Sequence, residues 1–279
     1  MVKNSIQCQI NFNIALRLSD MKYSICVTVY NSQDVVDDFL LPLINTEYEI
    51  IVVDGMSTDR TTELLSKYRD RVKIIEQKCS RGLGRKIAIE NSTGDVIIIV
   101  DFDIQVFSIA KIVDQYEKTA PDNKIAVFHL VGGDCTPNIF IGKKSLFEHY
   151  DAWQDVNCME DVLFEKVCNH FNALWRTQME ADYKCMKIRS NGPGRESRYE
   201  PGYVGKLTRR LKCTADVLFV SGFTYKEPLK YYKMEPIKGK LYGLAIYIPA
   251  KFMSHFIKTP SVENRIKQIC SSDPITGGK

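Results

Sequence analysis

Residues 23–131 alternate between strand-like and helix-like patterns, and this alternation constrains the fold more than any other feature of the sequence. Runs rich in β-branched and aromatic residues, such as YSICVTVY and DVIIIV, are separated by segments with helical apolar spacing. Such a rhythm predicts an α/β fold with a doubly wound, mostly parallel central sheet flanked by helices. We expect strands at 23–30, 49–53, 72–76, 95–100, 124–131 and 138–143, and helices at 34–44, 58–68, 85–92, 108–119 and 159–169.

Polar residues gather where the expected strands end. They are Tyr30-Asn31, Asp54-Gly55, Arg81-Gly82 and Asp101-Phe102-Asp103. In a sheet of this kind, ligands bind at the carboxyl ends of the strands. The sequence therefore predicts a ligand cleft along this edge of the sheet.

The stretch VDFDI places Asp101 and Asp103 one residue apart, directly after an apolar strand. If the strand continues through them, their side chains point the same way and Phe102 points the other. Adjacent carboxylates repel, so a neighbouring cation is expected. Oxygen ligands suit Mg²⁺ or Mn²⁺, which also accept phosphate oxygens and water. The pattern favours a divalent metal site, and the alternative is a pair of solvated loop aspartates.

The segment EIIVVDGMSTDRT sets Asp54 at a strand tip. Its carboxylate can accept hydrogen bonds from a nucleobase N–H or a ribose hydroxyl, and Gly55 permits a ligand to approach closely. Taken alone, the segment favours an ordinary turn in which Ser57, Thr58 or Asp59 caps the next helix.

The segment CSRGLGRKIAIEN places Arg81, Arg85 and Lys86 around two glycines at an expected helix start. Cations there oppose the helix dipole, unless an anion such as a diphosphate occupies the site. A solvated basic loop is an equally good interpretation.

The segment CMEDVLFEKV places Glu160 and Asp161 at the start of an amphipathic helix. Acids in a first turn often serve only the helix dipole. The functional interpretation is a general base.

Composition excludes several classes of protein. A net charge of +4 is too weak to indicate nucleic-acid binding. The nine cysteines are scattered without a CxxC pair, which argues against a disulfide framework or zinc site and favours reduced thiols in the cytosol. Residues 1–20 show no secretory signal, and no run reaches the roughly 18 apolar residues of a spanning helix.

Taken in order, these motifs resemble those of the family 2 glycosyltransferases, which have the GT-A fold. The resemblance covers residues 22–170 and rests on the Tyr-Asn strand end, the DG-S-D-x-T turn, the DxD and the ED pair. Two departures are Ser32-Gln33, where the family often has an acid, and Arg85-Lys86-Ile87, where Ala-Arg-Asn is common. The QxxRW signature of processive members is absent, which argues against polymer synthesis.

The resemblance implies a metal-dependent inverting enzyme. It would transfer a sugar from a nucleoside-diphosphate donor to an acceptor hydroxyl or a lipid phosphate. A UDP-sugar is the expected donor because UDP is the commonest nucleotide in this family. By the same resemblance the nucleoside pocket would be lined by Thr28, Tyr30, Asp54 and Gly55.

The resemblance also implies roles for the charged motifs. Asp101 would contact the ribose or the water shell of the metal, and Asp103 would ligate Mg²⁺ or Mn²⁺. Arg81 or Arg85 would stabilise the departing diphosphate. Asp161, beside Glu160, would be the general base.

Three parts of the chain are expected. Residues 1–21 form an extension, residues 22–190 form the catalytic domain with a nucleotide-binding half (22–131) and an acceptor half (132–190), and residues 191–279 form an irregular or helical C-terminal extension. Within the last part, the apolar stretch 241–257 follows several lysines. A helix packed on the catalytic domain is the preferred interpretation. The alternative is peripheral contact of residues 226–258 with the cytoplasmic membrane face, which would suit a lipid-linked acceptor.

Two other function classes stay open. A sugar-nucleotide-forming nucleotidyltransferase usually has a glycine-rich basic loop after its first strand, where this chain has residues 30–33, YNSQ. A non-catalytic binding protein on a similar domain would have no need of the DxD and ED acids. The released product separates them, because a transferase releases nucleoside diphosphate, a nucleotidyltransferase releases pyrophosphate, and a binding protein releases neither.

Overall fold

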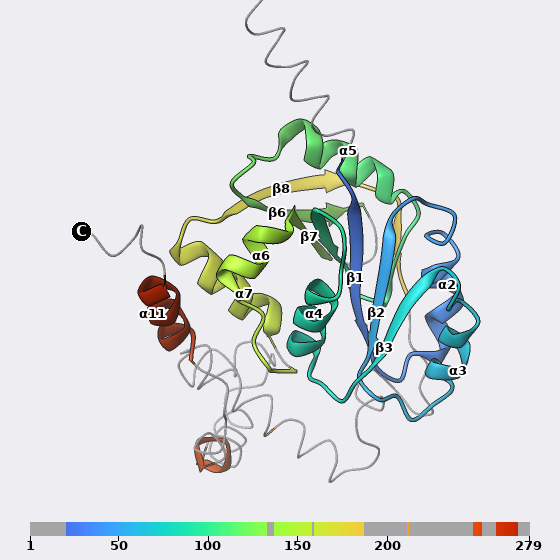
Figure 1. The fold of residues 1–279 in the computed structure, drawn as a ribbon, viewed down its shortest axis with the longest axis horizontal. Coiled ribbons are helices and arrows are strands. Elements are labelled where there is room, and N and C mark those ends of the chain that lie inside the picture. Colours follow the sequence, from blue (N-terminus) through green and yellow to red (C-terminus); the bar gives the residue numbers. More distant parts are fainter. Residues whose placement is uncertain are drawn as a thin grey trace, which may run out of the picture.

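The computed structural model describes residues 21–132, 137–157, 159–186, 211, 248–252 and 261–272. A seven-stranded sheet forms the centre of this part of the chain (Figure 1). In spatial order its strands are β3 (Val72–Glu76), β2 (Glu49–Asp54), β1 (Tyr23–Val29), β4 (Val96–Ile99), β7 (Asn138–Lys143), β6 (Ile125–Val131) and β8 (Leu174–Glu180).

Most neighbouring strands of this sheet are parallel. Strands β3, β2, β1 and β4 run in one direction, and β6 pairs with β8 in parallel. Only β7 runs against its two neighbours, β4 and β6. A separate antiparallel pair joins β5 (Ile104–Val106) to β9 (Tyr183–Cys185). The predicted doubly wound, mostly parallel sheet is therefore confirmed.

Helices cover both faces of the sheet. One apolar cluster joins the sheet to residues of η1 (Gln33–Val35), α2 (Val36–Leu40), α3 (Thr61–Ser66) and α5 (Ile109–Thr119). A second cluster, on the other face, joins it to residues of α4 (Arg81–Glu90), α6 (Lys144–Tyr150), α7 (Glu160–His170) and α11 (Val262–Ser272). Figure 1 shows α4, α6 and α7 together in front of the sheet, with α11 beside them.

The central strands are mostly apolar because both of their faces are buried. In β1, Ile25 and Val27 belong to the first cluster and Cys26 to the second, and all three are 0% exposed. Strands β2 and β4 alternate in the same way. Each such side chain contributes about 1.5–3 kcal/mol through burial, so this sheet is the rigid base of the edge where ligands are expected.

The expected strands at 23–30, 49–53, 72–76, 95–100, 124–131 and 138–143 are all present, but three helix boundaries differ. The expected helix at 34–44 is divided, and α2 ends at Leu40. Helix α3 begins at Thr61 rather than Thr58, because the carboxylate of Asp59 accepts a hydrogen bond from the Thr61 amide. Helix α4 begins at Arg81 rather than Arg85, because Ser80 caps it by accepting from Leu83 N.

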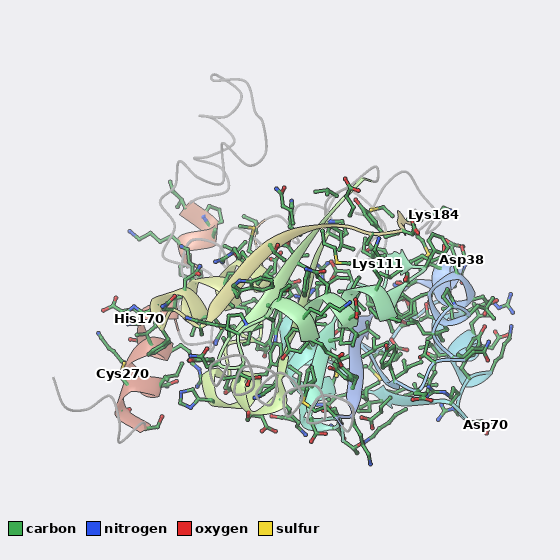
Figure 2. The ribbon with its side chains drawn as sticks, turned by 90° about the horizontal axis from the view of Figure 1, so that it is seen from above. Asp38, Asp70, Lys111, His170, Lys184 and Cys270 are labelled. Atoms are coloured by element: carbon green, nitrogen blue, oxygen red, sulfur yellow. The ribbon has the colours of Figure 1, made fainter. Side chains whose placement is uncertain are left out.

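Several elements were not expected from the sequence: α6, β5, β8, β9 and α11. Strand β8 mixes Leu and Met with charged residues at an edge of the sheet, so it lacks an apolar run. Seen from above (Figure 2), Asp38 of α2 and Lys184 of β9 lie near each other. There Gln105 Nε2 of β5 donates to the Asp38 carbonyl at 2.7 Å, which ties the small sheet to α2.

The expectation that the scattered cysteines are reduced thiols needs one correction. Cys185 at the end of β9 is disulfide-bonded, whereas Cys26, Cys79, Cys168 and Cys270 are free thiols. Scattered spacing gave no sign of this bridge, since pairing depends on distance in the fold.

The C-terminal predictions are tested only in small part. No helix of the described residues is long and apolar enough to cross a membrane. Of the stretch 241–257, residues 248–252 are described and helical, and the rest of residues 226–258 lies outside the described residues. The membrane contact, the cytoplasmic location and the domain boundaries stay predictions.

Candidate active site

The candidate site lies where β1, β2 and β4 end and helices α4 and α7 begin. The strand expected at 95–100 is present, but the alternation of side chains does not extend through Asp101 and Asp103, because these residues follow the strand in a turn. Strand β4 ends at Ile99, and Ile104 N donates to Asp101 O at 3.0 Å, which closes a turn. Phe102 is buried in this turn and stacks on Phe39 with a centroid distance of 4.5 Å. Two aromatic rings therefore hold the turn that carries the acidic pair.

Arg85 links the two acidic motifs. Its side chain is only 5% exposed; Nη2 lies 2.5 Å from Asp101 Oδ1, and Nη1 lies 3.4 Å from Glu160 Oε1. Its guanidinium carbon also lies 4.6 Å from the ring centroid of Trp153. The buried guanidinium lies between two carboxylates and attracts both, through a hydrogen bond to Asp101 and an ionic contact to Glu160.

Glu160 is the buried acid of the ED pair. It is 2% exposed, and its Oε1 also lies 3.1 Å from Arg81 Nη1. Its other oxygen, Oε2, is buried and has no hydrogen-bond partner among the residues that the structure describes. Both predicted arginines thus meet at Glu160 of the predicted ED pair, and one oxygen of Glu160 can accept from a further donor.

The two glycines of the basic motif are required by packing. A Cβ atom at Gly82 would lie 1.9 Å from the Gln154 carbonyl oxygen, and one at Gly84 would lie 2.4 Å from Thr28 Cγ2. The first glycine lets the start of α4 approach residues 152–157, and the second lets it approach β1. Close approach of the backbone to a ligand is therefore not needed to explain either glycine.

Asp54 is fully buried and bonded within its own loop. Its Oδ1 accepts from Ser57 N at 3.0 Å and Ser57 Oγ at 2.6 Å, and its Oδ2 accepts from Thr62 Oγ1 at 2.6 Å. Gly55 N donates to Val29 O at 2.9 Å, and a Cβ at Gly55 would lie 3.6 Å from the Tyr30 ring. Asp54, Gly55 and Tyr30 are therefore close together, and their contact with a nucleoside stays a prediction.

The loops after β1 and β2 bond to each other, a feature that sequence reasoning missed. Asn31, in the left-handed region with φ of 45°, donates its amide to Ser57 Oγ at 2.8 Å and accepts from Thr58 N at 2.7 Å. Asp59 accepts from Gln33 N at 3.2 Å and from Thr61 N at 3.0 Å. The polar residues of the DG-S-D-x-T turn thus join two loops, and Asn31 was detectable because asparagine tolerates the left-handed conformation.

Asp161 differs from Glu160 in its surroundings. It is half-buried, and its Oδ1 accepts from the following amide, Val162 N, at 2.9 Å. Asp103 is 8% exposed, and its carbonyl accepts from Met186 N at 2.8 Å. Thr28 Oγ1 lies 3.4 Å from the Arg81 carbonyl, beneath the start of α4. The predicted residues therefore gather at one edge of the sheet.

Two further residues at this edge were missed. Trp153 stacks on Phe164 with a centroid distance of 4.3 Å and lies against Arg85. The only signal for it was its rarity, since the chain has two tryptophans. Cys79 lies near Gly84, and burial raises the pKa of its thiol to about 11, with the charges of Asp155 and Asp54 acting in the same direction.

Comparison with known proteins identifies this segment. Residues 24–160 match the model of Glycosyl transferase family 2. This segment belongs to glycosyltransferase family 2. The family 2 segment contains the site residues from Thr28 to Glu160; Asp161 follows it directly, and α11 lies well beyond its C-terminal end.

Three curated relatives are about one-third identical to this chain over stretches of 93–95 residues. Poly(ribitol-phosphate) beta-N-acetylglucosaminyltransferase TarS of Staphylococcus aureus is 31% identical over 93 residues, which are 30% of this chain and 16% of the relative. Poly(ribitol-phosphate) beta-glucosyltransferase of Bacillus spizizenii is 37% identical over 94 residues, which are 30% of this chain and 15% of the relative. Dolichol-phosphate mannosyltransferase of Pyrococcus furiosus is 34% identical over 95 residues, which are 30% of this chain and 26% of the relative. The chain thus spans about a quarter or less of the length of these relatives.

A solved structure confirms the predicted GT-A fold. S. aureus TarS residues 1–349 in complex with UDP-GlcNAc superimposes with a TM-score of 0.52 at 20% identity, covering 71% of this chain and 67% of that one. A match at this identity concerns the fold alone.

Proposed function

We propose that this chain is an inverting glycosyltransferase that uses a nucleoside-diphosphate sugar, with a UDP-sugar as donor. The observation that carries the proposal is the ion-pair network in which Arg85 joins Asp101 of the DxD to Glu160 of the ED pair. These residues come from three separate segments of a family 2 domain. A solvated basic loop and unrelated helix-capping acids would give no reason for such convergence.

Asp161 is the general base of the proposed reaction, with Glu160 as a positioning residue. Glu160 is 2% exposed and lies against two guanidinium groups, so it is closed off from an acceptor hydroxyl. Asp161 is the more exposed of the two acids and follows Glu160 directly at the start of α7. Asp161 takes the proton of the acceptor hydroxyl as its oxygen attacks the anomeric carbon.

Arg81 is the arginine best placed for the departing diphosphate. Its side chain is 35% exposed, against 5% for Arg85, and both contact Glu160. Arg85 then holds the acids in place, and Arg81 balances the negative charge that grows as the bond from the anomeric carbon to the diphosphate breaks. Attack from the face opposite to the leaving group inverts the anomeric carbon.

The acidic turn fits a divalent cation completed by substrate. The described residues contain no group of three or more side chains that could hold a metal ion by themselves. Mg²⁺ is commonly held by one or two carboxylates together with substrate phosphates and water. Asp103 and Asp101, whose side chain is 42% exposed, suit this arrangement. A bound Mg²⁺ or Mn²⁺ would supply positive charge to the diphosphate.

The proposal names two classes of acceptor and one cellular location. The relatives named above act on poly(ribitol-phosphate) or on dolichol phosphate, so we keep a sugar-polymer hydroxyl and a lipid phosphate as acceptor classes. A lipid-linked acceptor would agree with peripheral membrane contact of residues 226–258 from the cytoplasmic side.

Release of nucleoside diphosphate tests the proposal. The protein is incubated with UDP-GlcNAc or UDP-glucose, a divalent cation and acceptors of both classes, and free UDP is measured. Asp161→Asn should lower turnover about 10²–10⁴-fold and leave UDP binding intact, because general-base help has this size. Glu165→Gln, on the same helix but paired with Arg176 at the surface, is the control. Full activity of Asp161→Asn would refute the base assignment, and release of pyrophosphate would favour a nucleotidyltransferase.

A further inference from the structure

Residues 151–157 form a loop, here called the Trp153 loop, that wraps the first turns of α4. At one end, Asp151 Oδ1 lies 2.8 Å from Lys86 Nζ. At the other end, Gly82 N donates to Val156 O and Arg81 N donates to Asn157 Oδ1, both at 3.1 Å. The loop is therefore fixed to α4 on both sides of Arg85.

Helix α11 is attached to the same loop. Arg265 Nη2 lies 2.6 Å from Asp151 Oδ2 and donates to the Tyr150 carbonyl at 3.4 Å. Its side chain is 18% exposed, against 29% for that of Asp151. One carboxylate thus joins a lysine of α4, which contacts both of its oxygens, to an arginine of α11, which contacts Oδ2.

Burial also fixes α11 on this side of the molecule. Ile269 is 4% exposed and belongs to the apolar cluster that includes Phe164 and Val167 of α7. In Figure 2, Cys270 of α11 and His170 of α7 lie along the same flank. Helix α11 therefore contacts both the helix that carries Glu160 and Asp161 and the loop that supports Arg85.

Asp151 is suited to this junction by its backbone. It ends α6 in the left-handed conformation with φ of 37°, and asparagine or aspartate tolerates this conformation better than most residues. Two residues later, Trp153 lies against the Arg85 guanidinium. A displacement at Asp151 would be passed directly to the ring beneath Arg85 and to the backbone that bonds Arg81.

From these contacts we infer that Arg265 is a positioning residue of the donor site. Through Asp151 it holds the Trp153 loop against α4, and so keeps Arg81 and Arg85 where the diphosphate binds. The inference rests on the proposed function for its kinetic part only. It gives α11, which lies outside the family 2 segment, a role in donor binding.

Donor kinetics test the inference in Arg265→Ala, Asp151→Asn and the double variant. The KM for the sugar donor should rise about tenfold in each single variant with kcat retained, because loss of alignment weakens binding of the diphosphate. The donor KM of the double variant should be no higher than that of either single variant, because the two residues act through one contact. Arg265→Lys should recover most of the loss. A merely destabilised protein would lose kcat through its folded fraction and keep the donor KM.

Lys267→Ala is the matched control. Lys267 is on the same helix and pairs with Glu263 at the surface, where both side chains are more than two-thirds exposed. Its donor KM should equal that of the wild type. An unchanged KM in Arg265→Ala, or effects that multiply in the double variant, would overturn the inference.

Hydrogen exchange tests the positioning without any activity. The amides of Arg81 and Gly82 should exchange about tenfold faster in Arg265→Ala and Asp151→Asn than in Lys267→Ala, because local opening of the Trp153 loop exposes them. Equal exchange in all three variants would refute the inference even if no donor were found. Failure of the wild type to release UDP would instead count against the proposed function alone.

Discussion

Replacing Gly82 with alanine tests whether the basic motif is shaped by packing. The new Cβ would lie 1.9 Å from the Gln154 carbonyl oxygen and 3.3 Å from Glu160 Cβ, so the Trp153 loop must move. Overpacking of this kind costs about 1–3 kcal/mol and sometimes more. Alanine is favoured over glycine in a helix by up to about 1 kcal/mol, which offsets part of the cost. We expect a net loss of about 1–2 kcal/mol.

The assay is thermal unfolding of the ligand-free protein. For a domain of this size, about 1 kcal/mol shifts the Tm by about 2–4 °C, so Gly82→Ala should melt about 2–8 °C lower. Gly55→Ala is the control, because its Cβ would meet nothing closer than 3.6 Å, an ordinary contact. A Gly82→Ala protein as stable as Gly55→Ala would refute the packing argument.

Three further predictions follow from the same edge of the sheet. Glu160→Gln removes one of the two carboxylates beside the buried Arg85 and should lower the Tm more than Glu165→Gln does, since the latter breaks only a partly exposed pair. The rate at which Cys79 is alkylated, measured by mass spectrometry, should rise about tenfold per pH unit from pH 7 to 10, because its pKa is raised to about 11 and only the thiolate reacts. A rate that reaches a plateau below pH 9 would contradict this. Asp59→Ala should cost about 1–2 kcal/mol in denaturant unfolding, because the Gln33 and Thr61 amides lose their acceptor.

The central sheet could be predicted from the sequence because its strands are buried on both faces. An apolar run such as VIII at 96–99 indicates either a buried strand or a buried helix, and its short length and flanking polar residues favour the strand. Edge and peripheral elements gave no such signal. Strand β8 alternates irregularly between apolar and charged residues, and α11 follows a long segment without clear periodicity.

The acids and arginines of the site were predictable as residue types, but their partners were not. The sequence pattern pointed to Asp101, Glu160, Arg81 and Arg85 as separate motifs. That Arg85 joins two of them depends on α4 lying against both β1, the neighbour of β4, and α7, which is a property of the packed fold. The turn at 101–104 was missed for a related reason, because pairing of β5 with β9 draws the chain away from the main sheet.

Binding of UDP in the presence of Mn²⁺, measured by isothermal titration calorimetry, tests the central claim most directly. The claim is that the acidic turn and the arginines of α4 together hold a diphosphate. The wild type should bind UDP, and binding should be lost on removal of the metal or in Asp103→Asn. Equal UDP affinity in the wild type and Asp103→Asn, with and without Mn²⁺, would contradict the account.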